Sequence, residues 1–398
     1  MKSTKTVRLG DVCEVVRGVR VTRKDLASDG KYPVYQNSLK PLGMYSAYNC
    51  EGNNPFMIMA LAAGEVAWSK SPFWAADDCT YFTNLKSLNP RYLYYTLQAK
   101  KQELLRYVKQ TTIPRLSNKY LESLEIPLPP LSEQEAIVAR LDAALVRATR
   151  LAEHFATIAQ NADLSFKATL AETFARGAEE SRGSRNTRNP REPSEPREPS
   201  QEWPLVRLGD VCESLSTGPF GSALHRSDYE ETGIPIVNPM HITNGEIRAT
   251  QNMAVSEATA QRLANYRLKK DDVVIGRRGE MGRLAIVGEK EQGWLCGTGC
   301  FFLHLTKDIF PQYFLFAMTS QPCISQMTGV ATGTTIPNLN SSTLMGISFP
   351  LPPLSVQRDI VARLDAARAR CEGIAEQARR GAAAVENLKK ALLKEAFE

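Results

Sequence analysis

Long apolar runs are missing from this chain of 398 residues. No stretch of about 18 consecutive apolar residues occurs, so the sequence predicts no membrane-spanning helix. The first residues, Met-Lys-Ser-Thr-Lys-Thr, lead into charged sequence without an apolar segment. We therefore expect no secretory signal and a cytoplasmic location. Histidine is scarce too, with four residues and no triad spacing, which argues against hydrolytic catalysis.

Motifs for binding nucleotides and cofactors are also missing. The chain has no Gly-x-x-x-x-Gly-Lys-[Ser/Thr] loop, which would cradle phosphates. Asn54-Pro55-Phe56 resembles the Asn-Pro-Pro-Phe tetrapeptide of amino-methyltransferases, but it lacks the second proline and no glycine-rich cofactor turn accompanies it. We expect no catalytic residues and no cofactor in this chain.

The eight cysteines are scattered, as expected for reduced thiols in a reducing compartment. Cys296, Cys300 and His304 follow at steps of four, a spacing that allows a zinc site. In an extended strand, however, Cys296 and His304 would lie roughly 27 Å apart, and no fourth ligand is near. Buried core cysteines are the better interpretation, and we predict no metal site. The net charge of +6 permits binding to a polyanion without requiring it.

An internal duplication organises what is present. The eight residues from Val7 to Glu14 return unchanged from Val206 to Glu213, a displacement of 199 positions. Pro-Leu-Pro-Pro-Leu-Ser at 127–132 returns at 350–355, and Val-Ala-Arg-Leu-Asp-Ala at 138–143 returns at 361–366, both displaced by 223. Such matches identify two copies of one unit.

Each copy combines a variable part with a part of fixed length. The variable parts, about 15–112 and 214–335, share almost no sequence, whereas 113–174 and 336–398 keep a constant offset. This arrangement suggests that the constant frame sets a distance and that the divergent inserts recognise something.

The constant parts predict long helices. Pro127, Pro129 and Pro130 exclude a helix before Ser132, and Ser132 with Glu135 has the spacing of a capping box. Ser355 can cap the second helix. Steps of four and three then predict a coiled-coil seam in each helix. Its positions are Ile137, Leu141, Ala144, Ala148, Leu151, Phe155, Ile158 and Ala162, and Ile360, Leu364, Ala367, Cys371, Ile374, Ala378, Gly381, Val385, Leu388 and Leu392.

Equal length and register favour antiparallel pairing of the two helices. The alternative is two independent amphipathic helices, each packed on its own domain. The expected fold is α+β: two mixed α/β globular domains joined by two long antiparallel coiled-coil helices, as a pseudo-twofold repeat. The predicted boundaries are a first domain at 1–131, a helix at 132–176, a flexible linker at 177–202, a second domain at 203–354 and a helix at 355–398. The linker is rich in Pro, Arg, Glu and Ser and has no large apolar residue.

Cations beside glycine turns are the best candidate contacts. Gly276-Arg-Arg-Gly-Glu-Met-Gly282 lies between two strand-like runs, so Arg277 and Arg278 can reach a phosphate or a guanine. A solvated hairpin is the alternative. Two segments, 109–115 and 333–338, occupy matching positions before the long helices and carry hydroxyls, amides and cations that suit DNA contacts. Ordinary turn chemistry is the alternative there. The candidates are Lys109, Gln110, Thr111, Arg115, Thr334, Thr335 and Asn338.

The order of these motifs, twice over, resembles the specificity subunit of a type I restriction–modification system. The resemblance covers essentially the whole chain. It is carried by Trp203-Pro-Leu-Val-Arg-Leu-Gly-Asp-Val and its first-copy counterpart, Thr217-Gly-Pro-Phe-Gly-Ser222, Thr335-Ile-Pro-Asn-Leu339, Ile126-Pro-Leu-Pro-Pro-Leu-Ser-Glu-Gln134 and Phe349-Pro-Leu-Pro-Pro-Leu-Ser-Val-Gln357.

The resemblance implies that each variable block is a target-recognition domain that binds one half of a split, asymmetric sequence in double-stranded DNA. The helices would set the spacer and dock two methyltransferase subunits, which carry S-adenosylmethionine. Through these, two restriction subunits that use ATP and Mg would join. This subunit itself would catalyse nothing. The first block is shorter and lacks a counterpart of the Gly279–Gly282 turn; the nearest is Gly64-Glu-Val-Ala-Trp-Ser-Lys70. Further candidate DNA contacts are Lys70, Ser222 and His225.

Two other functions fit the sequence. One is the recognition subunit of a related bifunctional restriction–methylation enzyme. The other is a coiled-coil scaffold that grips proteins and does not bind DNA.

Overall fold

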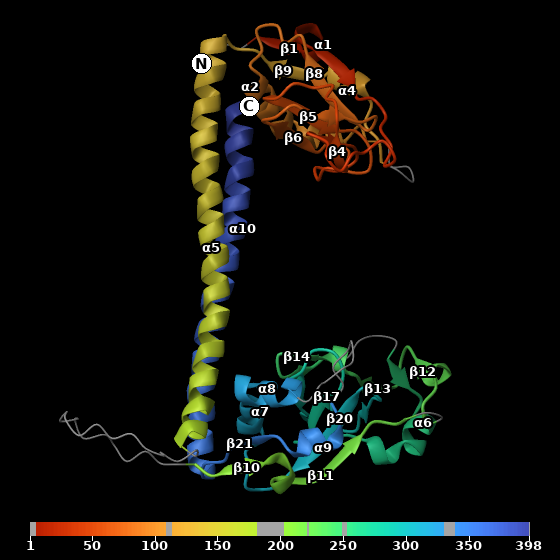
Figure 1. Ribbon diagram of the computed structural model, residues 1–398, viewed down its shortest axis with the longest axis vertical. Coiled ribbons are helices and arrows are strands. Elements are labelled where there is room, and N and C mark those ends of the chain that lie inside the picture. The colour runs from red at the N-terminus through yellow and green to blue at the C-terminus, as the bar shows by residue number, and fades with distance from the viewer. Residues whose placement is uncertain are drawn as a thin grey trace, which may run out of the picture. The chain divides into compact units, whose positions relative to one another are not determined.

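The computed structural model describes residues 5–108, 114–180, 203–220, 223–248, 253–329 and 339–397, with side chains in the first long helix up to Phe174. The chain forms two compact units, Met1–Ile158 with Gln377–Glu398, and Ala159–Glu376. Each unit holds a mixed α/β domain and parts of the long helices α5 (Leu131–Glu180) and α10 (Leu354–Phe397) (Figure 1). The predicted fold class is confirmed. Helix α5 continues four residues into the predicted linker, and 181–202 lie outside the described residues.

The first domain is built on a four-stranded antiparallel sheet with the order β2-β8-β5-β6. A smaller sheet, β4-β3-β7, adjoins it. The elements are β1 (Thr6–Arg8), α1 (Leu9–Val12), β2 (Glu14–Arg17), β3 (Tyr32–Tyr35), β4 (Gly43–Tyr45), β5 (Asn54–Ile58), β6 (Val66–Ser69), β7 (Trp74–Ala75), β8 (Cys79–Thr83), α2 (Pro90–Ala99), α3 (Lys101–Leu105), α4 (Asn118–Glu122) and β9 (Glu125–Pro127).

The second domain has a central sheet of the same design, with the order β11-β20-β17-β18. A second sheet, β12-β16-β13-β19, lies beside it in the larger insert. The elements are β10 (Leu205–Arg207), β11 (Cys212–Thr217), β12 (Tyr229–Glu230), β13 (Ile234–Val237), β14 (Ile242–Thr243), β15 (Glu246–Ile247), β16 (Ala254–Val255), α6 (Glu257–Arg262), β17 (Val273–Gly276), β18 (Leu284–Ile286), β19 (Leu295–Cys296), β20 (Cys300–Leu305), α7 (Pro311–Thr319), α8 (Gln321–Gly329), α9 (Ser341–Met345) and β21 (Ser348–Pro350). Short 3₁₀ turns cover Leu208–Asp210, Arg226–Asp228, Pro239–His241 and Ala264–Tyr266.

The two repeated motifs of each copy form one structure. Strand β1 pairs with β9, so that Val7 faces Ile126, and β10 pairs with β21, so that Val206 faces Phe349. The opening motif therefore runs antiparallel to the segment that leads into the proline motif. This two-stranded sheet therefore brings together the two ends of the insert that separates the motifs in the sequence.

A buried glutamine fastens each long helix to its domain. Helix α5 begins at Leu131, and the carbonyl oxygen of Pro130 accepts from the main-chain N–H of Glu133 and Gln134. Ser132 therefore lies inside the first turn, and the predicted capping box is wrong. The Gln134 side chain is fully buried. Its oxygen accepts from the N–H of Asn89 (2.8 Å), and its amide nitrogen donates to the carbonyl oxygens of Ser87 (2.9 Å) and Pro129 (2.8 Å).

Gln357 makes the same contacts in the second copy. Its oxygen accepts from the N–H of Phe310 (2.7 Å), and its nitrogen donates to the carbonyl oxygens of Asp308 (2.9 Å) and Pro352 (2.8 Å). Asn89 and Phe310 are the N-cap residues of α2 and α7. One amide thus connects the start of the long helix with the start of the domain helix in both copies.

The long helices pair in antiparallel fashion, as predicted. In the first unit, Phe397 near the end of α10 packs on Tyr92, with ring centroids 5.2 Å apart, and shares the domain core with Ile137. In the second unit, Phe174 in α5 packs on Tyr313 at 5.5 Å and shares a core with Ile360. The alternative of two independent helices is therefore wrong.

The seam between the helices follows mainly the predicted stripe, and four of its 18 predicted positions are wrong because their side chains are exposed. Leu151 and Leu388 are 45% and 50% exposed, and Ile158 and Ile374 are exposed as well. The buried predicted positions are Leu141, Ala148, Ala162, Ile360, Leu364, Ala378 and Val385; Ala375, which was not predicted, is buried too. Gly381 explains why small residues are needed, because a Cβ atom there would lie 2.6 Å from the Phe155 ring. Four of the larger side chains, those of Leu151, Ile158, Ile374 and Leu388, lie at the exposed margins.

The cysteine prediction is confirmed in the second domain. Cys296 and Cys300 are fully buried, and burial raises the pKa of the Cys300 thiol to about 12. His304 is bound to Asp272 instead, with 3.0 Å between its Nδ1 and the carboxylate. Within the described ranges no cluster of three or more potential metal ligands occurs, and no helix is long and apolar enough to cross a membrane.

The buried glutamine gives the first prediction. Gln134→Leu keeps the side-chain volume but leaves a buried N–H and two carbonyl oxygens unpaired. We expect the free energy of unfolding to fall by about 3 kcal/mol, measured by urea denaturation. Gln160→Leu, at an exposed position of α5, is the matched control and should change it by less than about 0.5 kcal/mol. Equal effects of the two variants would contradict a stabilising role for the buried Gln134 amide.

Candidate nucleic-acid interface

Five of the candidate contacts lie in the described part of the chain: Lys70, Arg115, His225, Arg277 and Arg278. The others lie outside it and have no structural account here: Lys109, Gln110, Thr111, Ser222, Thr334, Thr335 and Asn338.

The two kinds of predicted contact segment meet at one place in the fold. After β5, the N–H of Met59 donates to Asp78 and its carbonyl oxygen accepts from Leu116 (2.7 and 2.9 Å). After β17, Arg277 makes the same pair of bonds with Gly299 and Leu339 (both 2.9 Å). The arginine turn and the segment before the long helix, which were separate features of the sequence, are therefore neighbours at the end of the central sheet.

A glycine marks the equivalent strand end in both copies. The N–H of Gly18 donates to Cys79 (2.9 Å), and that of Gly218 donates to Cys300 (3.1 Å). A Cβ atom at Gly18 would lie 2.1 Å from the Ala76 carbonyl oxygen, and the corresponding distance at Gly218 is 2.0 Å. Only glycine allows this close approach. Because the two contacts are equivalent, each residue at this end of the first sheet can be matched with one residue of the second.

In the first domain this place is a polar cleft of about 410 Å³. Arg115 donates to the Asp78 carboxylate (3.1 Å), and Thr80 donates to the Asn118 side-chain oxygen (2.8 Å). Its lining residues are Arg17, Met59, Asp77, Asp78, Thr80, Tyr107, Arg115, Leu116, Ser117, Asn118 and Tyr120.

Two further features of the cleft were missed in the sequence. Arg17, at the end of β2, donates through Nε to the main-chain oxygen of Asp77 (2.9 Å). Tyr107 and Tyr120 stack with their centroids 4.6 Å apart and an interplanar angle of 20°. These residues come from separate segments, and no spacing in the sequence connects them.

In the second domain the equivalent place is occupied by Arg277. Its guanidinium lies between the rings of Phe220 and Phe301, 5.0 and 4.9 Å from their centroids. Its Nε is buried and has no hydrogen-bond partner in the described chain. Burial, and next the neighbouring Arg278 charge, lower the pKa of Arg277. Arg278 itself is exposed beside Gly279, whose φ of 84° turns the chain back.

Lys70 and His225 do not belong to these places. Lys70 is exposed after the end of β6, and His225 precedes the short turn Arg226–Asp228, where its N–H donates to Asp228 (2.8 Å). Neither lines the first-domain cleft.

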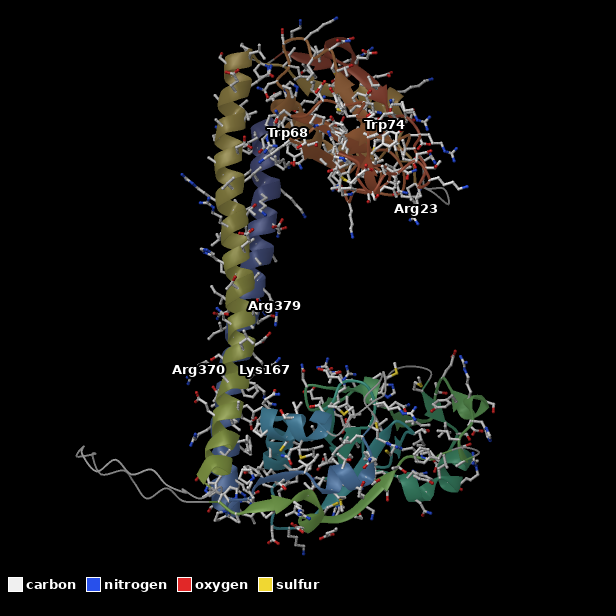
Figure 2. The ribbon with its side chains drawn as sticks, in the orientation of Figure 1. Arg23, Trp68, Trp74, Lys167, Arg370 and Arg379 are labelled. Atoms are coloured by element: carbon white, nitrogen blue, oxygen red, sulfur yellow. The ribbon has the colours of Figure 1, made fainter. Side chains whose placement is uncertain are left out.

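A larger cleft of about 830 Å³ lies in the first unit between the domain and the long helices. In this cleft the Arg91 guanidinium lies 4.9–5.0 Å from the ring centroids of Trp68, Tyr94 and Tyr95. It also donates to the Asp142 carboxylate of α5 (2.8 Å). Tyr95 also donates to Asp142. Trp68 lies on the side of the domain that faces the helices (Figure 2). Since its charges are mostly paired, this cleft serves to attach the domain.

Comparisons with known proteins agree on one family. A family model described as the type I restriction modification DNA specificity domain matches residues 1–154 and 200–379. The EcoBI specificity subunit of Escherichia coli is 22% identical over 309 residues, which are 78% of this chain and 65% of that protein. The MjaVIII specificity subunit of Methanocaldococcus jannaschii is 23% identical over 380 residues, 90% of this chain and 85% of that protein.

Solved structures show the same fold. A chain solved in work on complex assembly and conformational transition of the type I R-M system matches with a TM-score of 0.72 at 19% identity, covering 100% of this chain and 98% of that chain. The HsdS subunit from Thermoanaerobacter tengcongensis matches with a TM-score of 0.54 at 19% identity, covering 100% and 97%. With the family model matched in both copies of the repeat, this chain belongs to the type I restriction–modification DNA specificity subunits, which recognise DNA and are not enzymes.

Proposed function

We propose that each globular domain reads one half of a bipartite, asymmetric site in double-stranded DNA. The proposed recognition domains comprise residues 1–131 and 203–354. The proposal is supported mainly by one observation. The same end of the central sheet recurs in both domains, but it carries different side chains in each. In the first domain it holds the cleft with Arg17 and Arg115, and in the second it holds the Arg277–Arg278 turn. Equivalent positions with different side chains suit two different half-sites.

The long helices have a second role in this proposal. They set the spacer between the half-sites and dock two methyltransferase subunits, which carry S-adenosylmethionine. Two restriction subunits, which use ATP and Mg, join through these. Exposed apolar side chains along the helices support a docking role, since such residues mark interaction surfaces when they gather. They are Val146, Leu151, Ile158, Leu164, Ile374 and Leu388.

The central experiment exchanges one recognition block. Residues 15–112 are replaced by the block of another specificity subunit, and the methylated motif is mapped in cells that express the chimera with the cognate methyltransferase. We expect one half of the motif to change while the other half and the spacer stay. A wild-type complex that methylates no bipartite motif would favour the scaffold function. A change in both halves would contradict independent domains.

A second prediction concerns the helices. Four residues inserted after Ala148 would displace the following chain by about 6 Å and rotate it by about 40°. We expect the preferred spacer to change or binding to be lost, measured by binding to duplexes with a graded series of spacers. An unchanged preference would contradict the role of the helices in spacing.

Arg278 provides a third prediction, because it is exposed and has no hydrogen-bond or ion-pair partner among the described residues. At a phosphate contact, Arg278→Ala should weaken binding to all duplexes and lower the salt slope by roughly one. At a base contact it should cost about 1–3 kcal/mol and relax one position. Arg248→Ala removes an exposed, Glu246-paired arginine of the same domain and should leave affinity and slope unchanged. Wild-type behaviour of Arg278→Ala in salt-titrated binding would show that the turn does not face DNA.

A further inference from the structure

We propose that Arg17 and Asp77 together read a single C·G base pair, with Asp77 accepting from the cytosine amino group and Arg17 donating to guanine. The inference deepens the proposed function and rests on the first domain binding DNA.

The Arg17 guanidinium is bonded to the protein through Nε, whereas its two terminal nitrogens are unpaired among the described residues. Its Nε donates to the main-chain oxygen of Asp77 (2.9 Å), which fixes the guanidinium beside that residue. Arg17 lines the cleft, and neither of its terminal nitrogens has a hydrogen-bond or ion-pair partner among the described residues. The remaining two nitrogens form a fork of donors, the group that matches guanine O6 and N7.

Asp77 has the complementary property. Its Oδ1 is buried and accepts no hydrogen bond from the described chain. Buried acceptors in native proteins nearly always have a partner, because leaving one unpaired is unfavourable. An acceptor without a partner in a cleft that is open to a ligand is therefore suited to a donor that the ligand brings.

The other charged side chains of the cleft are already paired with each other. Arg115 is paired with Asp78, and the Asn118 oxygen accepts from Thr80. Arg17 and Asp77 are adjacent, so the charged donors of Arg17 and the unpaired oxygen of Asp77 lie side by side.

This pair of groups selects one kind of base pair in the major groove. Cytosine presents only the N4 donor there, which a carboxylate accepts, and its partner guanine presents two adjacent acceptors for the arginine fork. Adenine presents the N7 acceptor beside its amino group, which repels a carboxylate, and thymine offers a single acceptor. The combination therefore favours C·G over A·T.

The second domain lacks the pair at the equivalent positions. The Gly18 and Gly218 contacts align Arg17 with Thr217, and Asp77 with Thr298, whose hydroxyl donates to the carbonyl oxygen of Pro219 (2.8 Å). Loss of the charged pair should consequently affect only the half-site of the first domain. The other half-site serves as an internal control.

The test uses the full chain with its cognate methyltransferase and maps the methylated motif in cells by sequencing. We expect a C·G pair in the half-site that the block exchange assigns to the first domain. Asp77→Asn and Arg17→Gln should each relax that one position by roughly tenfold or more and leave the other half-site intact. Because Asp77 Oδ1 makes no bond in the protein, the melting temperature of Asp77→Asn should not fall.

Asp29→Asn and Arg23→Ala are the matched controls, since they make the same charge changes at exposed positions of the first domain outside the cleft lining; Arg23 is labelled in Figure 2. Both should keep the wild-type motif. An unchanged motif in Asp77→Asn overturns the inference and leaves the proposed function standing. Equal weakening at every position, or a lowered melting temperature, overturns it too, because a general charge effect or a structural role would then explain the residue. Absence of any bipartite motif with the wild-type chain would overturn the proposed function itself.

Discussion

The structure depends on one buried amide at the start of each long helix. Gln134 and Gln357 each make three hydrogen bonds that join the proline segment, the start of the long helix and the N-cap of the domain helix. A side-chain amide suits this place because it offers donors and an acceptor at fixed angles. Since the same contacts recur in both copies, the orientation of each helix on its domain is set by identical chemistry.

Because these glutamine contacts are constant, the sequences of the two inserts can diverge. The central sheets keep one strand order although their sequences share almost nothing, because the order is determined by pairing between strands and by burial on their faces. Differences accumulate at the strand ends, where a side chain can change without disturbing the core. Arg277 between Phe220 and Phe301 occupies the place that Met59 has in the first domain.

Much of the fold could be predicted from the sequence, and the reasons are physical. Prolines mark where each long helix can begin, and the repeat shows that the helices are equivalent. The seam was predicted except at four exposed positions, because whether Ile374 or the neighbouring Ala375 faces the partner helix depends on how closely the helices approach. The cleft could not be predicted, since Arg17, Asp77 and Arg115 come from three separate segments that only the folded sheet brings together.

The contact between Phe397 and Tyr92 has a consequence for biosynthesis. Tyr92 leaves the ribosome about 300 residues before Phe397, on the order of 15–60 s at ordinary rates of translation. During that interval the aromatic surface around Tyr92 lacks one of its covering side chains. The N-terminal domain therefore reaches its final packing only when synthesis has proceeded to the end of the second copy, which makes its maturation post-translational even though its own strands emerge first.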